Sequence, residues 1–382
     1  MNIVIWNCGD LQRKLCALLT EKLPADAVTC FVTNDRNALN DYVNPPIVSV
    51  GALRLLVKNS CVDKIIILAD DTDPAQYREI MRQFLCMGID WRRIFMYAEL
   101  RWFEEMLSDK RLYWFGGLLE LAKKKLPCLM NLEYEIVERC NLNCKRCNHF
   151  SNIFRDGKMT DFETFRNDMD FLKRHVFNIK RFKLLGGEPL LHPDLARLAE
   201  YSRKSFPYAP LSIITNGLLI PKMSEELIAT LKACNFTVEI SVYPPVRERL
   251  DEIVTFLNRH GIAHKVFRYG DEFGAFLNPN GNSDKMLAML SCYAQVCHAI
   301  KNGKLYRCTV VMNVDVFNRE YGANLPPSFL NIHELPQENV GEILTNYLAD
   351  PIEMCRFCTR FQYFPWEATK GNAAAQDWIV NV

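Results

Sequence analysis

The sequence lacks three features that would decide its class at once: a long hydrophobic run, an excess of charge of one sign, and an export signal. No window approaches the roughly 18 unbroken apolar residues of a membrane-spanning helix. Lysine and arginine total 46 against 45 aspartate and glutamate, and a net charge of +1 provides no broad attraction to nucleic acid or anionic membranes. The amino-terminal MNIVIWNCGDLQRKL has neither the basic start nor the apolar stretch and cleavage site of an export signal. We therefore expect a cytoplasmic protein that binds neither nucleic acid nor membrane.

What the chain has in unusual number is cysteine, with 15 among 382 residues. This is below the roughly 8 to 10% of short disulfide-built secreted chains, and a reducing compartment favours metal ligands, reactive thiols or core residues over disulfides. Seven cysteines are scattered singly among apolar residues and are expected to be small core residues: Cys8, Cys16, Cys30, Cys61, Cys86, Cys128 and Cys234. The other eight are clustered: Cys140, Cys144 and Cys147, then Cys292, Cys297 and Cys308, then Cys355 and Cys358.

The remaining composition, 49% hydrophobic and 24% charged, is that of a folded protein of roughly two to three domains. Short apolar strands alternating with amphipathic helices predict a parallel α/β domain over residues 1–98. Its strands are expected at 3–6, 28–32, 65–68 and 94–97, and its helices from Leu11, near Leu53 and after Pro74. A helical connector is expected over 99–128.

A second series of five βα units predicts part of a parallel barrel over residues 129–270. Its strands are expected near 132–137, 181–185, 211–215, 238–243 and 263–268, and no sixth strand is evident before Cys292. Residues 271–382 are irregular and are expected to form a further domain that holds five of the clustered cysteines.

The first cysteine cluster is a C-x3-C-x2-C run, Cys140, Cys144 and Cys147, directly after the first strand of the second series. Three thiolates on one tight loop can bind three irons of a [4Fe-4S] cube and leave the fourth iron open to a small molecule. The alternative is a structural zinc site, which needs four ligands and would have to recruit His149.

Two further motifs stand at the carboxyl ends of later strands, the edge at which catalytic sites of parallel barrels lie. Leu-Gly-Gly-Glu-Pro occupies 185–189, and Thr-Asn-Gly occupies 215–217. Glycine lets the backbone approach a ligand closely, and a carboxylate accepts hydrogen bonds from an ammonium group.

Strand alternation turns several polar side chains toward the barrel interior: Glu133, Glu135, Lys183, Glu239, Ser241 and Tyr243. Such an interior suits a hydroxylated or charged small substrate. Lys183, Glu239 and Tyr243 are therefore candidate catalytic residues for acid, base or substrate-orienting roles. The alternative is that these carboxylates pair with Lys183, Arg181 or one another.

Taken together, C-x3-C-x2-C after the first strand, GGEP after the second and TNG after the third resemble the radical S-adenosylmethionine (SAM) superfamily. The resemblance implies that Cys140, Cys144 and Cys147 bind a [4Fe-4S] cluster whose open iron is chelated by the amino and carboxylate groups of SAM. It further implies that an electron from the reduced cluster cleaves SAM to methionine and a 5′-deoxyadenosyl radical, which abstracts a substrate hydrogen atom.

The resemblance also implies which residues bind SAM. Gly186, Gly187 and Glu188, followed by Pro189, would hold the methionyl amine, and Asn216 and Ser241 would lie near the ribose or carboxylate. The residue before the third cysteine is usually aromatic in this superfamily and packs near adenine. Here it is Arg146, whose planar guanidinium group can also stack.

The carboxyl-terminal cysteines have the spacing C-x4-C-x10-C, followed far downstream by C-x2-C. Gly303 lies five residues before Cys308 and predicts a hairpin turn into a strand that presents this thiol. A cluster or a zinc ion staples irregular segments in this way. The layout resembles the SPASM and Twitch auxiliary-cluster extensions of radical SAM enzymes, which implies a second [4Fe-4S] cluster, with structural zinc as the alternative.

Five thiols compete for four places in this second site. Cys308, Cys355 and Cys358 fit the extension, and Cys292 fits its first spacing better than Cys297 does. The spare Cys297 would be either a hydrogen-atom donor or an inert core residue. Pro365-Trp366-Glu367 and Asp377-Trp378 also resemble a SPASM-type subgroup often found with polysaccharide biosynthesis.

The predicted fold class is α/β: a partial (β/α)6 radical SAM barrel, preceded by a Rossmann-like parallel α/β domain and followed by a Cys-rich auxiliary-cluster domain. In the first domain only Gly9 of a G-x-G-x-x-G dinucleotide fingerprint is present, because Asn7 and Gln12 replace the outer glycines. This domain could dock a partner or a sugar-nucleotide, or be structural and form a dimer.

The predicted function is removal of a hydrogen atom from a C–H bond of a small polar, carbohydrate-like substrate such as a sugar or sugar-nucleotide. Oxidation or epimerisation would be the outcome, and a reductant protein such as flavodoxin or ferredoxin would supply the electron. One alternative is a SPASM-type maturase that modifies a peptide. Another is a non-catalytic, metal-stabilised binding or electron-transfer protein, which leaves the GGEP and TNG motifs without a role.

Overall fold

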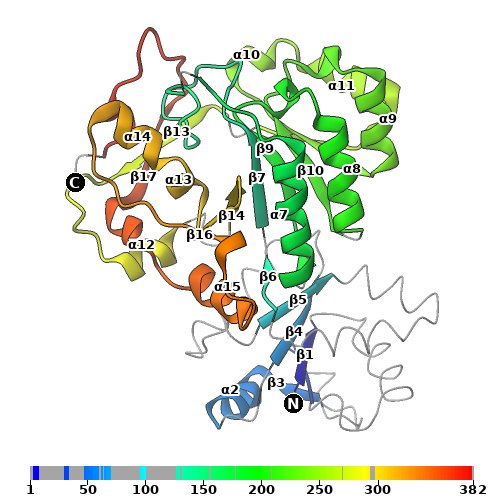
Figure 1. Ribbon diagram of the computed structural model, residues 1–382, viewed down its shortest axis with the longest axis vertical. Coiled ribbons are helices and arrows are strands. Elements are labelled where there is room, and N and C mark those ends of the chain that lie inside the picture. The colour runs from blue at the N-terminus through cyan, green and yellow to red at the C-terminus, as the bar shows by residue number, and fades with distance from the viewer. Residues whose placement is uncertain are drawn as a thin grey trace. The chain divides into compact units, whose positions relative to one another are not determined.

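The computed structural model of the protein describes most of the chain from residue 126 onward and selected parts before it (Figure 1). The described residues are 3–7, 30–33, 47–59, 62, 64–69, 95–99, 126–129, 131–154, 156–176, 178–207, 209–268, 270–292 and 297–380. Gly9, residues 100–125 of the connector expected over 99–128, and the helices expected from Leu11 and after Pro74 lie outside them. None of the described helices has the length and apolar character needed to cross a membrane.

The chain divides into two compact units. Unit 1 comprises Met1–Cys128, His175–Lys180 and Asn339–Ala349, and unit 2 comprises Leu129–Arg174, Arg181–Glu338 and Asp350–Val382. The boundary at residue 128 coincides with the predicted end of the connector. The predicted barrel and the predicted Cys-rich domain fall together in unit 2.

Unit 1 contains a five-stranded parallel sheet in the order β3-β2-β1-β4-β5. Its strands are β1 (Ile3–Asn7), β2 (Cys30–Thr33), β3 (Ile47–Ser49), β4 (Lys64–Ala69) and β5 (Phe95–Glu99). This order, with β1 beside β4, is that of doubly wound α/β folds. All four predicted strands are present, and β3 was missed because three residues are too few to show a pattern.

Two described helices belong to unit 1: α2 (Val50–Lys58) and α15 (Val340–Ala349). Ser49 caps α2, because its hydroxyl oxygen accepts a hydrogen bond from the Ala52 amide at 3.2 Å. A short pair, β6 (Cys128–Leu129) and β8 (Asn178–Ile179), forms a separate two-stranded sheet.

Unit 2 is built on an eight-stranded sheet in the order β12-β11-β10-β9-β7-β14-β15-β16. Its strands are β7 (Asn131–Val137), β9 (Phe182–Gly186), β10 (Leu211–Thr215), β11 (Phe236–Ser241), β12 (His264–Phe267), β14 (Cys297–Lys301), β15 (Lys304–Tyr306) and β16 (Leu330–Asn331). The strands from β12 to β14 are parallel, and β15 and β16 continue antiparallel. The five predicted βα strands are confirmed, and the sheet is open because β12 and β16 are its edges.

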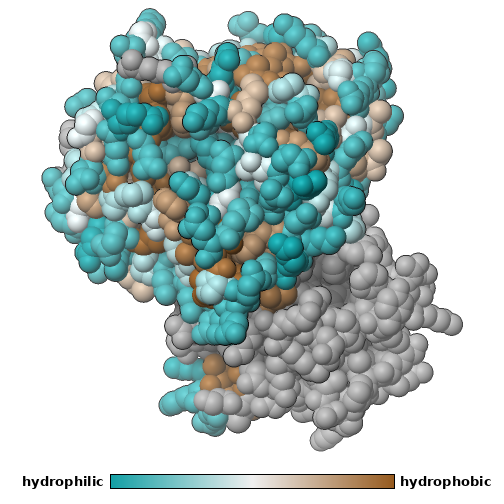
Figure 2. Space-filling view, viewed as in Figure 1, coloured by the Kyte–Doolittle hydropathy of each residue, from teal (hydrophilic) through white to brown (hydrophobic). Residues whose placement is uncertain are grey.

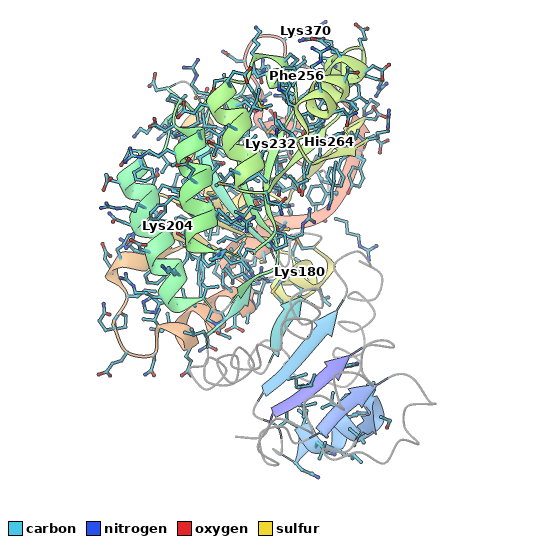
Figure 3. All side chains as sticks on the ribbon, turned by 90° about the vertical axis from the view of Figure 1, so that its right-hand side faces the viewer. Lys180, Lys204, Lys232, Phe256, His264 and Lys370 are labelled. Carbon is cyan, nitrogen blue, oxygen red and sulfur yellow. The ribbon has the colours of Figure 1, made fainter. Side chains whose placement is uncertain are left out.

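The helices after the parallel strands cover one face of this sheet (Figure 1). They are α7 (Phe162–His175), α8 (Leu195–Ser205), α9 (Glu225–Ala233), α10 (Pro244–Arg247) and α11 (Leu250–His260), with the 3-10 turns η2 (Pro189–Leu191) and η3 (Ile220–Lys222). Each longer helix buries an apolar stripe, as α7 does with Phe165, Met169 and Leu172. Exposed Lys204 and Lys232, on α8 and α9, mark the solvent side of this layer (Figure 3).

The region after residue 270 is more regular than predicted. Its further elements are β13 (Glu272–Leu277), α12 (Lys285–Ser291), α13 (Thr309–Met312), α14 (Val314–Tyr321), η4 (Ile332–Glu334), η5 (Glu353–Phe357), β17 (Cys358–Pro365) and η6 (Ala375–Asp377). β13 leaves the main sheet and pairs antiparallel with β17, and the sixth parallel strand, β14, lies beside β7 and not beside β12. The β14–β15 hairpin turns through Asn302 and Gly303, which both have positive φ (47° and 76°), as a type I′ turn requires.

An aromatic cluster joins this region to the first cysteine loop. Phe150 lies 5.3 Å, between ring centroids, from both Phe317 and Trp378, and all three side chains are buried. Polar side chains cover most of the visible described surface, with apolar patches between them (Figure 2).

Candidate functional site

The first cysteine loop leaves the carboxyl end of β7, which lies between the parallel strands β9 and β14. Cys144 is 7% exposed, and Cys140 and Cys147 are partly exposed. Burial, with the neighbouring thiolates adding to it, raises the pKa of Cys140 and of Cys144 to about 12, and burial also raises the pKa of Cys147. These thiols thus favour their neutral form, so a cation bound among them would be loaded with release of protons.

The GGEP loop packs directly against the start of the cysteine loop. The Gly187 amide donates to the Val137 carbonyl, and the Glu188 amide donates to the Arg139 carbonyl, both at 2.8 Å. A Cβ atom on Gly187 would lie 2.1 Å from the Arg139 carbonyl oxygen, so any side chain there would push the two loops apart. The glycine is therefore required for backbone packing between the loops, in addition to any approach of a ligand.

Glu188 joins the GGEP loop to the end of β10. Its carboxylate accepts hydrogen bonds from the Thr215 hydroxyl (2.7 Å), the Asn216 amide (2.9 Å) and the Leu190 amide (3.1 Å), and the last bond caps the 3-10 turn that begins at buried Pro189. Burial raises the pKa of Glu188 to about 7, against these hydrogen bonds, which lower it. The side chain is 0% exposed, so its demonstrated contacts position the TNG loop. Its contact with the methionyl amine stays a prediction.

Asn216 reaches from the TNG loop to the cysteine loop. Its side-chain nitrogen donates to the Asn141 side-chain oxygen at 2.6 Å and lies 3.8 Å from the Cys140 sulfur. Ser241 is buried at the end of β11, at the same edge of the sheet. The structure thus brings the cysteine loop, GGEP and TNG together.

Arg146 has a positive φ of 63°, which is unusual for a residue other than glycine. Its guanidinium carbon lies 4.1 Å from the centroid of the Phe364 ring, so one face of the guanidinium group is already stacked on an aromatic ring. The Nε atom of Arg146 is buried without a hydrogen-bond partner among the described residues. The adenine contact expected for Arg146 would use its other face.

The polar residues expected to face the barrel interior form ion pairs. Lys183 Nζ lies 3.2 Å from Glu133 Oε1, and Arg181 Nη2 lies 3.1 Å from Glu239 Oε1. These are the pairings named above as the alternative to catalytic roles for Lys183 and Glu239. Tyr243 is not part of the strand row, because β11 ends at Ser241 and Tyr243 begins α10, with its ring 5.5 Å from that of Phe273.

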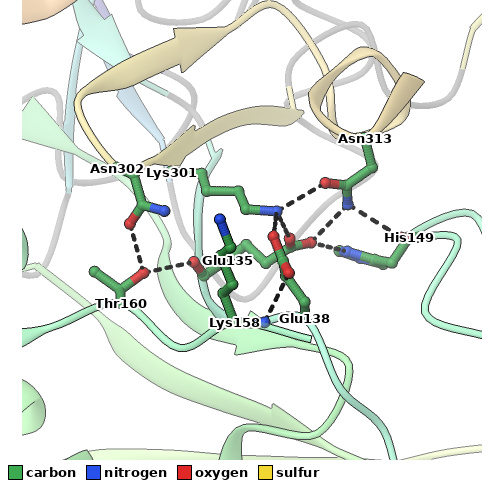
Figure 4. A network of polar contacts seen from close by, with 8 residues as sticks. All are labelled: Glu135, Glu138, His149, Lys158, Thr160, Lys301, Asn302 and Asn313. Atoms are coloured by element: carbon green, nitrogen blue, oxygen red, sulfur yellow. Dashed lines mark hydrogen bonds and ion pairs between the residues drawn. The ribbon is translucent and has the colours of Figure 1, made fainter. Parts of the chain in front are cut away.

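A second set of charged residues lies closer to the cysteine loop, and the sequence reading missed most of it (Figure 4). Glu135, 1% exposed, accepts from Lys301 at 2.6 Å and from the Asn313 side chain at 2.9 Å, and lies 3.1 Å from His149 Nδ1. Lys301 also pairs with Glu138 at 2.8 Å. Burial alone would raise the pKa of Glu135, but Lys301 and His149 outweigh it and hold the pKa at about 2. His149, which the alternative zinc site would have to recruit as its fourth ligand, is engaged by Glu135.

The second cysteine group is assembled from three separate segments. Cys292 ends α12, Cys308 precedes α13, Cys355 lies in η5 and Cys358 begins β17. Burial raises the pKa of Cys308 to about 12, with Cys292 and Cys355 adding to the effect. Burial also raises the pKa of Cys358, and the nearby Cys308, Cys355 and Cys292 add to this effect. Cys308 and Cys358 therefore each lie near Cys292 and Cys355, an arrangement that suits a shared cationic group.

Cys297 is separate from that group. Its sulfur accepts a hydrogen bond from the Asn131 side chain at 2.9 Å, and its charged neighbours are Glu133, Lys183 and Arg181. In the β14–β7 register Cys297 lies opposite Asn131. Val137, at the carboxyl end of β7, is six residues further, about 20 Å at roughly 3.3 Å per residue. Of the two roles considered for Cys297, this position gives no support to that of a hydrogen-atom donor.

Both cysteine groups fit iron–sulfur clusters by the chemistry of their donors. The first group offers three thiols, which leaves one iron of a cube without a protein ligand. The second group offers four thiols, one for each iron. Among the described residues, no three His, Cys, Asp or Glu side chains are arranged to hold one single metal ion. A [4Fe-4S] cube takes one thiolate per iron rather than several on one atom.

Comparison with known proteins agrees with this geometry. Residues 134–267, from β7 to β12, match the family model described as "Radical SAM superfamily". The chain contains a radical SAM domain. The predicted resemblance is thereby confirmed, and SAM and a [4Fe-4S] cluster are the cofactors of this superfamily.

The radical SAM domain is similar to parts of curated proteins with different names. The chain is 34% identical over 117 residues to GTP 3',8-cyclase of Trichodesmium erythraeum (strain IMS101), covering 28% of this chain and 34% of that protein. It is 27% identical over 133 residues to the antilisterial bacteriocin subtilosin biosynthesis protein AlbA of Bacillus subtilis (strain 168), covering 33% of this chain and 29% of that protein. The chain thus spans about a third of the length of these relatives.

Solved structures align over longer stretches at low identity. A crystal structure of BtrN in complex with AdoMet and 2-DOIA aligns with 61% of this chain and 93% of that chain, at 16% identity and a TM-score of 0.41. A crystal structure of Streptococcus suis SuiB bound to S-adenosylmethionine aligns with 70% of this chain and 78% of that chain, at 13% identity and a TM-score of 0.34.

Proposed function

We propose that the protein is an enzyme that reductively cleaves SAM and removes a hydrogen atom from a small polar, carbohydrate-like substrate, with net oxidation as the outcome. The observation that carries this proposal is the meeting of three loops at one sheet edge. The thiols of Cys140, Cys144 and Cys147, the GGEP loop and the TNG loop are joined there by direct hydrogen bonds.

In this proposal Cys140, Cys144 and Cys147 ligate the cluster, and Gly186, Gly187 and Asn216 surround SAM. When bound, SAM and the cluster supply a 5′-deoxyadenosyl radical that takes a hydrogen atom from a substrate C–H bond. The chain contributes positioning. Glu188 fixes the TNG loop through Thr215 and Asn216, and Gly187 lets the GGEP loop lie against the Arg139 backbone.

The polar network of Glu135, Glu138, Lys301, Asn313 and His149 supports a polar substrate. It lies beside the cysteine loop, because Glu138 follows β7 directly and His149 is two residues after Cys147. Buried charges are costly unless they are paired, and here each is paired and hydrogen-bonded. An apolar substrate would gain nothing from such a lining, whereas hydroxyl groups of a sugar could exchange hydrogen bonds with it.

Cys292, Cys308, Cys355 and Cys358 would ligate a second [4Fe-4S] cluster with no open iron. Such a cluster cannot bind substrate but can accept an electron. Oxidation of an alcohol carbon needs this step: after loss of a hydrogen atom, the carbon must lose one electron and its hydroxyl one proton to give a carbonyl. Epimerisation instead needs a hydrogen-atom donor. Cys297, on β14, lies opposite Asn131 at the start of β7, about 20 Å from the carboxyl end of that strand. The site therefore favours oxidation.

The second candidate function is modification of a peptide. It is supported by the match to a subtilosin biosynthesis protein, which covers 33% of this chain. Against it stands unit 1, whose five-stranded parallel sheet is not the small winged-helix domain usual in peptide maturases. The parallel sheet is better suited to docking a partner or a sugar-nucleotide, or to forming a dimer.

A flavodoxin or ferredoxin would supply the first electron.

The test is anaerobic reconstitution with iron and sulfide, followed by addition of SAM and a reductant. Wild-type protein should contain about eight irons and form 5′-deoxyadenosine. C308A/C355A should fall to about four irons, whereas C297A, the matched control, should keep about eight. A protein that holds its first cluster yet forms no 5′-deoxyadenosine contradicts the proposal.

Deuterium transfer from labelled sugars or sugar-nucleotides, compared with labelled peptides, would then identify the substrate class.

A further inference from the structure

A segment from the end of the chain is fixed against the first cysteine loop. We call residues 366–369 the brace. Ala368 pairs with Cys144 as an isolated antiparallel bridge, the Lys145 amide donates to the Glu367 carbonyl at 2.9 Å, and the Thr369 amide donates to the Asn143 carbonyl at 2.7 Å. Backbone bonds on both sides of Cys144 therefore set the position of the brace.

The brace places an indole N–H on one of the three cluster thiols. Trp366 Nε1 lies 3.2 Å from the Cys144 sulfur, within hydrogen-bonding distance for a sulfur acceptor. Its own amide is held by the Asp271 carbonyl at 2.7 Å. Indole is a donor only, so this contact is attractive to a thiolate and becomes stronger as negative charge on the sulfur increases.

A second tryptophan provides an internal comparison. Trp378 is 0% exposed and also donates its indole N–H to the cysteine loop, but its acceptor is the backbone carbonyl of Cys147 at 2.8 Å. The two indoles thus both donate to the same loop, at 3.2 Å from Trp366 and 2.8 Å from Trp378. Only the bond from Trp366 reaches a sulfur atom.

We propose that Trp366 raises the reduction potential of the first cluster through its hydrogen bond to Cys144. The inference rests on the proposed function in one respect, that Cys144 is a cluster ligand. Reduction adds one electron from the reductant protein, and part of the added charge lies on the ligand sulfurs. The N–H···S bond is therefore stronger in the reduced state, and hydrogen bonds to sulfur are among the factors that set cluster potentials. No proton moves and no covalent bond at Trp366 changes, so Trp366 is a positioning residue that acts through Cys144.

The experiment is a redox titration of the reconstituted full-length protein, followed by EPR. The signal that changes when SAM is added belongs to the cluster with the open iron, which separates it from the second cluster. W366F keeps a ring and removes the donor. Its reduced-to-oxidised ratio at the wild-type midpoint should fall roughly fivefold, which is about 40 mV at 59 mV per tenfold change for one electron.

Two further variants make the result specific. W366H restores an N–H donor and should recover part of the shift, whereas W378F removes a donor to the Cys147 carbonyl and should keep the wild-type midpoint. W366L is a second donor-free variant, to be used if W366F does not retain iron. An unchanged midpoint in W366F or W366L, or an equal shift in W378F, would overturn the role of Trp366. If SAM changes no EPR signal of the wild-type protein, the proposed function fails first and the inference falls with it.

Discussion

The two cysteine groups differ in how the chain builds them. Cys140, Cys144 and Cys147 lie within eight residues on one loop, whereas the second group draws Cys292, Cys308 and the Cys355–Cys358 pair from three segments. The first group is ordered by one strand end and by the loops that pack on it. The second depends on the tertiary fold of residues 277–358, so a metal group there would also hold those segments together.

The groups also differ in ligand number, and this separates their chemistry. Three thiols leave one iron of a cube open, while four thiols close it. The open cluster can bind a reactant, and the closed one can hold structure and carry electrons. Each change below should therefore affect one group and spare the other.

The largest effect is expected from C144A, which removes one of the three ligands proposed for the open cluster. Formation of 5′-deoxyadenosine should fall below detection, because SAM would lose its binding iron. The iron of the second group should remain at about four per chain. Product quantification with parallel iron analysis measures both, and C234A, a buried cysteine outside both groups, is the control. Retained SAM cleavage by C144A would remove Cys144 from the ligand set.

Next in size is C358A, which removes one of the four ligands proposed for the closed cluster. Because metal binding contributes folding free energy, the variant should lose several kcal/mol of stability in the segments that its ligands join. SAM cleavage should persist, but substrate oxidation should stop for lack of an electron acceptor. Hydrogen exchange over residues 277–358 and product analysis check this. Full substrate oxidation by C358A would show that the second group carries no electron.

A smaller, pH-dependent effect is expected at His298 on β14. This strand forms a hairpin with β15, and Cys308 follows β15. Burial, with nearby Arg307 adding to it, lowers the pKa of His298 to about 3, and its Nδ1 lies 3.0 Å from the Arg307 carbonyl. The folded protein keeps this ring neutral while the unfolded chain takes up a proton below about pH 6.5, so stability falls as the pH falls. Between pH 7 and 5.5 the loss should be about 1 kcal/mol.

Denaturant unfolding of wild type and H298N at both pH values measures this contribution. H298N should lose the His298 share of the pH dependence. H264N is the matched control, because His264 also contacts a backbone carbonyl, that of Ile262 at 3.0 Å, but is only partly buried. An unchanged pH dependence in H298N would contradict the assignment.

The smallest effect is expected from K145A beside the first group. Lys145 Nζ lies 3.3 Å from Glu367 and 3.4 Å from Asp377, and with side chains 29% (Lys145), 58% (Glu367) and 12% (Asp377) exposed, the pair with Glu367 is the more solvated of the two. Pairs of this kind contribute no more than about 1 kcal/mol. A fall in Tm of a few degrees, with SAM cleavage unchanged, is the expected result. Loss of the first cluster in K145A would instead show that the brace depends on this lysine.

The sequence was sufficient where function depends on local spacing. C-x3-C-x2-C, GGEP and TNG each follow a strand, and alternation located those strands to within about two residues. Residues that follow the carboxyl ends of neighbouring parallel strands must meet at one edge. The sequence therefore predicted that Cys140, Glu188 and Asn216 would lie together.

The sequence was insufficient where pairing is long-range. β14 is only five residues long, so nothing in its pattern indicated that it would continue the sheet beside β7. The partners of Glu135 were missed for that reason, since Lys301 belongs to β14 and Asn313 follows α13. The brace was equally hidden, because no local pattern relates Trp366 to Cys144, 222 residues earlier.

The central claim is that SAM binds directly to the cluster held by Cys140, Cys144 and Cys147. Electron-nuclear double resonance on the reduced protein, with SAM labelled by 15N in its methionyl amine, tests it most directly. The account predicts a 15N coupling to the cluster signal that is present in wild type and C358A and absent from C144A. A reduced cluster in the wild-type protein that shows no coupling at saturating labelled SAM would contradict it.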